Sequence, residues 1–146
     1  MRLFVRPTLL LLVAASSLFA AGTRIATDKP IVNFRLPDFT PEGNRSWLVR
    51  GSEARYATEG LVDIKELNLT IFSGQPDERV ETLLLSPSAE IRLTDRVVSG
   101  KDSIRVINDR FEASGSDWSY DHQAKKVSIA KNVRVILHTQ LNDILK

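Results

Sequence analysis

The chain has 146 residues, which is enough for one domain with a tail. It holds 20 Lys and Arg against 18 Asp and Glu, and the excess is accounted for by Arg2 and Arg6, since the first 22 residues contain no acid. The remainder is neutral, which argues against a nucleic-acid binder, because such a domain keeps its basic excess to displace counterions from phosphate. The absence of cysteine excludes a disulfide scaffold, thiolate catalysis and cysteine-ligated zinc.

Residues 1–22 have the pattern of a secretory signal peptide. Arg2 and Arg6 precede an apolar run from Leu9 to Ala21, and Ala20-Ala21-Gly22 offers the small residues that a leader peptidase requires. An uncleaved membrane anchor is the alternative, although Arg6 and Pro7 shorten the run below the usual spanning length. Either interpretation predicts that the rest of the chain lies outside the cytoplasm.

Three further regions follow the leader. Residues 23–44 contain three prolines and are predicted to be an extended leading segment, with a first edge strand over IVNFRLPDF (31–39). Residues 45–137 are predicted to form an all-β domain. Residues 138–146 are predicted to be a C-terminal tail with the pattern of a short helix, which would need docking to form.

The dominant hydrophobic period of the domain is two, as expected for half-buried strands. Val62 and Ile64 lie on one parity, whereas Leu69 and Ile71 continue on the other. This one-residue slip near Glu66 predicts either a β-bulge or a point where the strand passes from one sheet to another. Glycines fall between several of the alternating runs, where turns are expected.

The domain also contains an approximate internal repeat. Three segments share a small residue followed three positions later by an apolar one, at Gly51 and Ala54, at Ser86 and Ala89, and at Gly115 and Trp118. The anchors are separated by 35 and 29 residues. Three such units predict an elongated, open β structure, and an ordinary β-sandwich with accidental spacing is the alternative.

The opening unit resembles a known family. The pattern W-x-L-x-G-x-x-A-x-Y, present here as Trp47, Leu48 or Val49, Gly51, Ala54 and Tyr56, is similar to the first repeat of the periplasmic lipopolysaccharide-export proteins.

The closing unit resembles the same family more strongly. The turn glycine Gly115, then DWSYD (117–121), then KKVSIAKNVRVIL (125–137), is similar to the OstA-like domain shared by the LptA and LptC components, and the layout is closer to LptC. The resemblance covers residues 31–137. It implies an open β-jellyroll that carries the acyl chains of lipopolysaccharide on its inner face, docks with other OstA-like modules through edge strands, and works with an inner-membrane ABC transporter.

Alternation and resemblance together give the candidate residues of an apolar lipid groove. A dry core is the other interpretation for each of them. The candidates are Ala54, Tyr56, Val62, Ile64, Leu69, Ile71, Ala89, Ile91, Leu93, Ile104, Val106, Phe111, Trp118, Tyr120, Val127, Ile129, Val133 and Val135. The polar tips of Trp118 and Tyr120 are expected to suit a half-wet mouth.

The sequence predicts no catalytic residue, cofactor or metal site. His122 is interpreted as a solvated turn histidine and His138 as a surface residue near the chain end, because neither has partners at metal-ligand spacing. Asp109, Asp117 and Asp121 lack the spacing of a calcium loop and are assigned to turns. The sequence therefore predicts a non-catalytic periplasmic lipid carrier. An envelope assembly protein that associates through sheet edges without lipid is the alternative.

Overall fold

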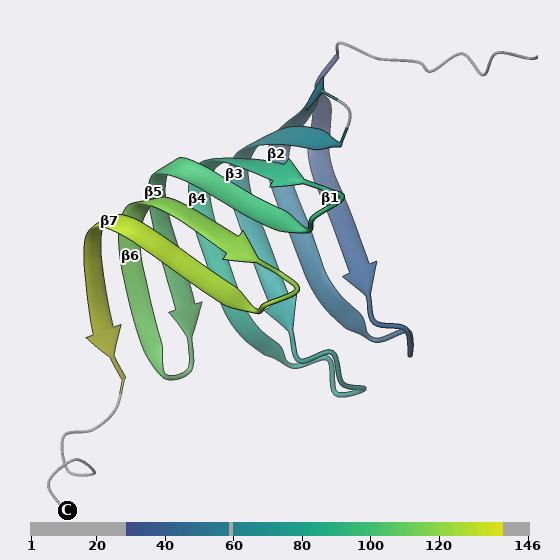
Figure 1. The fold of residues 1–146 in the computed structure, drawn as a ribbon. Coiled ribbons are helices and arrows are strands. Elements are labelled where there is room, and N and C mark those ends of the chain that lie inside the picture. Colours follow the sequence, from purple (N-terminus) through teal and green to yellow (C-terminus); the bar gives the residue numbers. More distant parts are fainter. Residues whose placement is uncertain (1–28, 59, 139–146) are drawn as a thin grey trace, which may run out of the picture.

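The computed structural model describes residues 29–58 and 60–138, which fold into a single antiparallel sheet. The strands lie in the sheet in the same order as in the chain, and no helix lies between them in the described residues (Figure 1). They are β1 (Ile31–Phe39), β2 (Arg45–Thr58), β3 (Leu61–Phe72), β4 (Val80–Arg92), β5 (Val97–Asn108), β6 (Phe111–Asp121) and β7 (Lys126–Leu137). The all-β prediction is confirmed. The helix predicted for the C-terminal tail lies outside the described residues.

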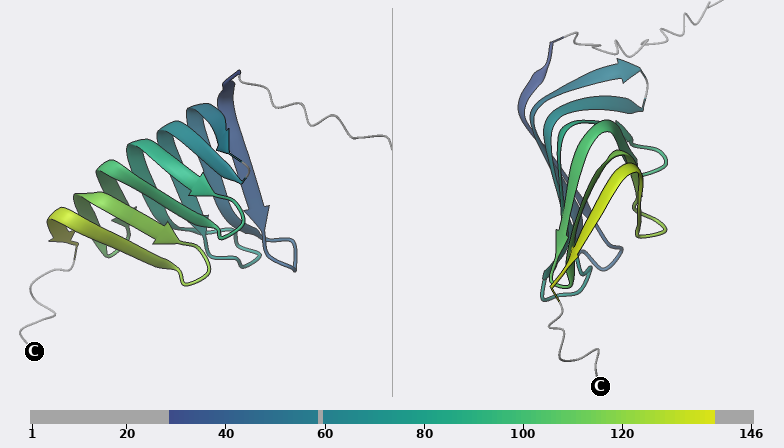
Figure 2. Two further views of the ribbon diagram at one scale, coloured as in Figure 1. Left: turned by 45° about the horizontal axis from the view of Figure 1, so that its top comes forward. Right: turned by 90° about the vertical axis from the view of Figure 1, so that its left-hand side faces the viewer.

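The sheet is folded over on itself, so that each strand contributes to two layers (Figure 2). We call the layer that holds the β1–β2, β3–β4 and β5–β6 turns the lower arm, and the other the upper arm. The upper arms of the later strands cross over the lower arms of the earlier strands (Figure 1). No backbone ladder joins β1 to β7 within the described ranges, so the structure is an open jellyroll rather than a barrel.

At the fold line, strands β1 to β4 and β6 move their inner face from one parity to the other, whereas β5 and β7 keep one parity and their pairing with β6 shifts register there. In β3, Ile64 and Leu67 are both buried, whereas Lys65 and Glu66 between them are exposed. Glu66 adopts a positive φ of 52°, and the pairing of β3 with β2 pauses at the bend and resumes without a shift in register. The slip near Glu66 is therefore the passage of the strand from the upper to the lower arm, and the bulge interpretation is wrong.

The internal repeat marks this fold line. In each repeat the small residue lies on the inner face of the lower arm, and the apolar residue three positions away lies on the inner face of the upper arm. These pairs are Gly51 and Ala54 in β2, Ser86 and Ala89 in β4, and Gly115 and Trp118 in β6. Residues an even number of positions apart in a strand lie on the same face of the sheet. The separation of three therefore means that the residues facing the interior change from one side of the strand to the other at the bend.

Two glycines allow neighbouring strands to approach each other at the bend. A Cβ atom at Gly115 would lie 2.4 Å from Ile129 Cγ2 and 2.7 Å from the Lys131 carbonyl oxygen. A Cβ atom at Gly51 would lie 2.4 Å from Ile64 Cγ2. Neither position accepts a side chain without displacing the neighbouring strand.

The β4–β5 ladder opens at the bend, and side chains replace its missing hydrogen bonds. Pairing stops at Leu85 and resumes at Glu90 with a shifted register, and Pro87, which has no N–H to donate, lies in this gap. The buried Ser86 hydroxyl lies 2.9 Å from the carbonyl oxygen of Ser88 and 2.8 Å from that of Ser103. It supplies a donor to backbone acceptors that the ladder leaves free.

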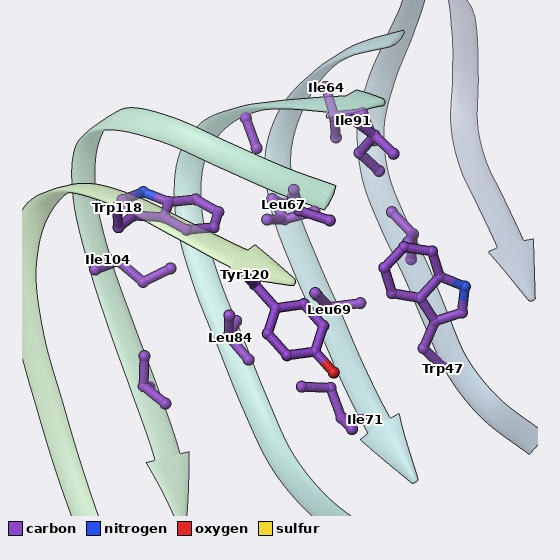
Figure 3. Close-up of a cluster of buried hydrophobic side chains, with 14 of the residues drawn as sticks. Trp47, Ile64, Leu67, Leu69, Ile71, Leu84, Ile91, Ile104, Trp118 and Tyr120 are labelled. Atoms are coloured by element: carbon purple, nitrogen blue, oxygen red, sulfur yellow. The ribbon is translucent and has the colours of Figure 1, made fainter. Parts of the chain in front are cut away.

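The hydrophobic core fills the space between the arms. One continuous cluster of buried side chains extends from β1 to β6. Figure 3 shows the part of it that lies between Trp47 of β2 and Tyr120 of β6. It consists of Phe34, Trp47, Val49, Ala54, Val62, Ile64, Leu67, Leu69, Ile71, Leu84, Ala89, Ile91, Val98, Ile104, Val106, Ala113, Trp118 and Tyr120.

The two ends of the sheet are single edge strands. The first is β1, whose bounds agree with the predicted strand 31–39, and Pro37 lies within it, where a missing ladder donor is tolerated. The second is β7, which is largely exposed along its length. Each edge strand pairs on only one side among the residues that the structure describes.

Replacing Gly115 with alanine should destabilise the domain by about 1–3 kcal/mol, because the new methyl group overpacks the bend against β7. Thermal or urea unfolding followed by circular dichroism measures the change. Ser119→Ala, on the same strand but away from the bend, is the control and should change stability by less than about 0.5 kcal/mol. Equal stability of the two variants would contradict the close approach described above.

Candidate functional site

The inner face of the folded sheet is where the structure places the predicted groove residues. Most of them are buried in the core cluster: Ala54, Val62, Ile64, Leu69, Ile71, Ala89, Ile91, Ile104, Val106, Trp118 and Tyr120. Leu93, Phe111, Val127 and Ile129 are partly buried against it, and Tyr56, Val133 and Val135 are exposed. In this conformation the middle of the predicted groove is thus filled by its own side chains.

Sequence reasoning missed several members of the inner face. Trp47 and Val49 lie on the lower arm of β2, and Leu84, Val98 and Ala113 lie on the strands that follow. Their alternation with exposed neighbours is the same signal that identified the others. Trp47 was visible as the start of the first repeat, yet its place in the interior follows only from the fold.

The interior becomes accessible at β7. Val135 and Leu137 lie opposite the inner-face positions Ala113 and Phe111 of β6, and Val133 shares their parity on β7; the exposed fractions of Val133, Val135 and Leu137 are 54%, 54% and 64%. Ile136 lies on the outer face of the same strand and is 47% exposed. The apolar inner face therefore extends past the closed core and ends in an uncovered strip of three side chains.

The opposite end shows a smaller uncovered region. Ile31 of β1 and Tyr56 of β2 lie on the inner side of the upper arm and are 40% and 59% exposed. The apolar interior is therefore reachable from both edge strands and covered in between.

The side of the molecule opposite the bend is closed by a polar cluster around His122. This residue follows β6 at the end of the upper arm, whereas Ser46 and Trp47 lie at the start of β2 on the lower arm. The His122 ring stacks on the Trp47 indole with centroids 4.5 Å apart and an interplanar angle of 26°. Its Nε2 lies 2.5 Å from Ser46 Oγ, and its Nδ1 lies 2.9 Å from the Tyr120 hydroxyl.

The interpretation of His122 as a solvated turn residue is wrong, since only 4% of it is exposed. It does lie at the β6–β7 turn, but the crossing of the arms brings that turn over the start of β2. Tyr120 and Trp118 are also buried rather than placed at a wet mouth, and the Tyr120 hydroxyl is used in binding His122. His138 is exposed, as predicted.

An ion pair supports the same closure. Asp38 at the end of β1 lies 3.5 Å from Arg96 in the β4–β5 turn, and this turn also accepts a backbone hydrogen bond from His122 at 3.1 Å. Lys125 Nζ lies 3.4 and 3.3 Å from the two ring nitrogens of His122. We refer to Asp38, Ser46, Trp47, Arg96, Tyr120 and His122 together as the clasp.

Burial lowers the pKa of His122 to about 4, and the charges of Lys125 and Arg96 act in the same direction against the smaller opposing effects of Asp38 and Asp121. Burial also raises the pKa of Tyr120 and lowers that of Lys125. A neutral imidazole has one N–H donor and one acceptor nitrogen, so it can bond both hydroxyls at once. The clasp is therefore built around the neutral form of His122.

A hollow of about 630 Å³ lies at the upper arm near the bend, lined mostly by polar and charged residues together with the core residues Ile64, Ala89 and Trp118. Its walls carry both signs of charge, with Glu53 held in ion pairs by Arg55 at 3.0 Å and by Lys65 at 3.2 Å. This mixture selects neither an anion nor a cation. No cluster of potential metal ligands is present among residues 29–58 and 60–138.

Taken together, these features define a class of protein: a β-module made of one folded sheet, with an apolar interior that is uncovered at its edge strands. The model of the LptC family, described as lipopolysaccharide-assembly, LptC-related, matches residues 13–138. The chain belongs to this family, and the resemblance seen in the sequence is confirmed. A comparison with curated proteins finds no match.

The part of the chain described by the structure has no helix long and apolar enough to cross a membrane. The predicted leader (1–22) lies outside the described residues, so it remains a prediction.

The clasp should make the stability of the domain depend on pH. The pKa of His122 rises from about 4 in the folded state to its ordinary value of 6.5 on unfolding, so the unfolded state binds the proton more readily between these values. Stability should fall as the pH falls from 6.5 to 4, with His122 contributing about 3 kcal/mol to the loss. Urea unfolding at several pH values would measure the slope.

The variant His122→Gln is the control, because it keeps hydrogen-bonding groups but cannot titrate. Its stability should fall less steeply over the same window, while the contribution of the carboxylates stays the same in both proteins. Parallel pH profiles for the two proteins would show that His122 is not held neutral by burial.

Proposed function

We propose that this protein is a non-catalytic lipopolysaccharide-transport module of the bacterial envelope, which carries the acyl chains in the apolar interior between its arms. The family match supports a role in lipopolysaccharide assembly. On this proposal the protein acts in the periplasm, either free or held by an uncleaved leader, and passes the lipid toward the outer membrane.

The observation that carries the proposal is the continuity of the apolar inner face. It extends through all seven strands without a buried charge on the core cluster, and at β7 it is uncovered at Val133, Val135 and Leu137. A protein that needed only a core would gain nothing from extending that face onto an uncovered edge strand, since exposed apolar strips mark interaction sites.

Burial of acyl chains supplies enough free energy for binding without covalent chemistry. Each buried CH₂ contributes about 0.8 kcal/mol, so a saturated chain of about twelve carbons would contribute on the order of 10 kcal/mol. Part of this is offset by separating side chains that already contact each other in the core. Movement along the interior then requires energy from another protein, such as an inner-membrane ABC transporter, because the described chain has no nucleotide-binding fold.

The edge strands support docking with similar modules. An unpaired strand presents a row of backbone groups to another chain, and β1 and β7 each pair on only one side among the described residues. Addition of a second OstA-like module at β7 would cover the exposed strip and extend the apolar interior from one module into the next.

A photo-crosslinking amino acid at Val135 should capture lipopolysaccharide in cells, because this side chain lies on the uncovered inner face of β7. Ile136 provides a matched control, since it is also apolar and half-exposed but lies on the outer face of the same strand. We expect a lipopolysaccharide adduct at Val135 that is at least several-fold stronger than at Ile136. Equal adducts, or adducts only at Ile136, would contradict the proposal.

The second candidate function is an envelope assembly protein that associates through its edges without lipid. The two edge strands favour this function. A packed interior is also as consistent with an assembly protein as with a carrier that holds no lipid. In that case no lipopolysaccharide would be captured at Val135, whereas Val133→Pro on β7 would abolish association. Light scattering of the purified protein measures the association.

A further inference from the structure

The interior of the domain is covered on two long sides in different ways. On the bend side, the strands themselves are continuous and form a wall of backbone. On the opposite side, the arms touch through side chains alone, and the closest of these contacts are in the clasp. An acyl chain cannot pass through the backbone wall, so sideways access to the interior is possible only on the side that holds the clasp.

The clasp joins residues that are distant in the chain. Ser46 and Trp47 of the lower arm meet His122 of the upper arm, 76 positions from Ser46. Trp47 and Tyr120 belong at the same time to the core cluster, and their ring centroids lie 6.4 Å apart (Figure 3). Separation of Trp47 from His122 would therefore uncover the core directly behind them.

The contacts of the clasp suit repeated opening. Ser46 and His122 are joined by a single hydrogen bond between neutral groups, and Trp47 adds a ring stack on His122 and a tilted contact with Tyr120. The Asp38–Arg96 pair is partly exposed, so water can solvate both charges when the arms separate. No strand pairing needs to break, because β2 and β6 are not neighbours in the sheet.

We propose that Ser46, Trp47 and His122 form a gate that keeps the empty interior closed and must open before an acyl chain enters. This inference rests on the proposed lipid-carrying function and adds the place where the arms part. In the lipid-free protein the gate covers apolar surface that would otherwise be exposed to water or to other proteins. In the loaded protein the acyl chain takes the place of the Trp47–His122 contact.

The absence of cysteine from the sequence allows a direct test. In the double variant Ser46→Cys/His122→Cys, a short bis-maleimide with a reducible linker would join the arms across the gate. The probe is purified lipopolysaccharide, and its binding to the full chain is measured before and after reduction of the linker. Binding should fall at least tenfold in the joined protein and return when the linker is cleaved.

Two controls separate locking from chemical modification. The same double variant treated with a monofunctional maleimide carries the modification but leaves the arms free, and it should bind lipopolysaccharide. The variant Ser88→Cys/Asp102→Cys joins two side chains that contact each other across β4 and β5 beside the bend, so cross-linking it should leave binding within about twofold of the uncross-linked protein. Circular dichroism confirms that each protein is folded.

The outcomes distinguish failure of the gate from failure of the carrier function on which it rests. If the unmodified chain binds lipopolysaccharide and the joined gate binds it equally well, the gate is wrong while the carrier function stands. If no form of the protein binds lipopolysaccharide, the carrier function itself fails and the gate fails with it. Loss of binding that is specific to the joined gate and reversed by reduction supports both.

Discussion

Every strand of this protein must keep an apolar face toward the interior in both arms, although the strand bends between them. The whole structure depends on the strands bending at the same place. Two exposed residues in β3, Lys65 and Glu66, separate two buried ones, which changes the parity of the inner face while the pairing with β2 keeps its register on both sides of the bend. Because the positions line up from strand to strand, the bends add into one fold line. In β1 to β4 and β6, a strand without this change of parity would present the apolar residues of one arm to water, whereas β5 and β7 keep one parity and their pairing with β6 shifts register instead.

The fold line requires irregular backbone at its centre. Glu66, Asp117 and Asn132 adopt positive φ angles within their strands, and only asparagine and aspartate tolerate such angles well among these types. Gly51 and Gly115 permit an approach that any other residue would block. Such conformations persist because the two arms on either side are firmly packed against each other.

The closed interior and the proposed carrier function are compatible. A core that never had to open would be expected to close with apolar residues throughout, whereas the side opposite the bend is closed by His122, two hydroxyl groups and an ion pair. Polar groups of this kind regain hydrogen bonds in water when they separate, so they oppose opening less than apolar packing would. The chemistry of the closure thus differs from that of the core for a physical reason.

Much of the fold follows from local patterns. The bounds of the first strand agree with its alternation and with Pro37 at an edge, and the parity slip near Glu66 indicated the bend in β3. The repeat predicted an open β structure, and only the structure shows that its small residues mark the bend. The candidate interior residues follow from alternation, which identifies a buried face but carries no information on what that face encloses, and the structure places most of them in a packed core.

His122 shows what local reasoning misses. Its neighbours Asp121, Gln123 and Ala124 do form the turn that the sequence indicates, with the Asp121 carboxylate accepting hydrogen bonds from both following backbone N–H groups. The burial of His122 arises instead from Ser46 and Trp47, which reach it only because the arms cross. No pattern within a few residues of His122 contains that information.

The strand order has a consequence for how such a domain is assembled and how it can vary. Each strand forms its ladder only with the strands before and after it in the chain, so the sheet grows by successive hairpins and requires no closure between its ends. Repetitive architectures of this kind tolerate gain or loss of a unit at an end, since the remaining units keep their own neighbours. Length is therefore a freely adjustable dimension of the scaffold, and a longer or shorter relative could span a different distance with the same local rules.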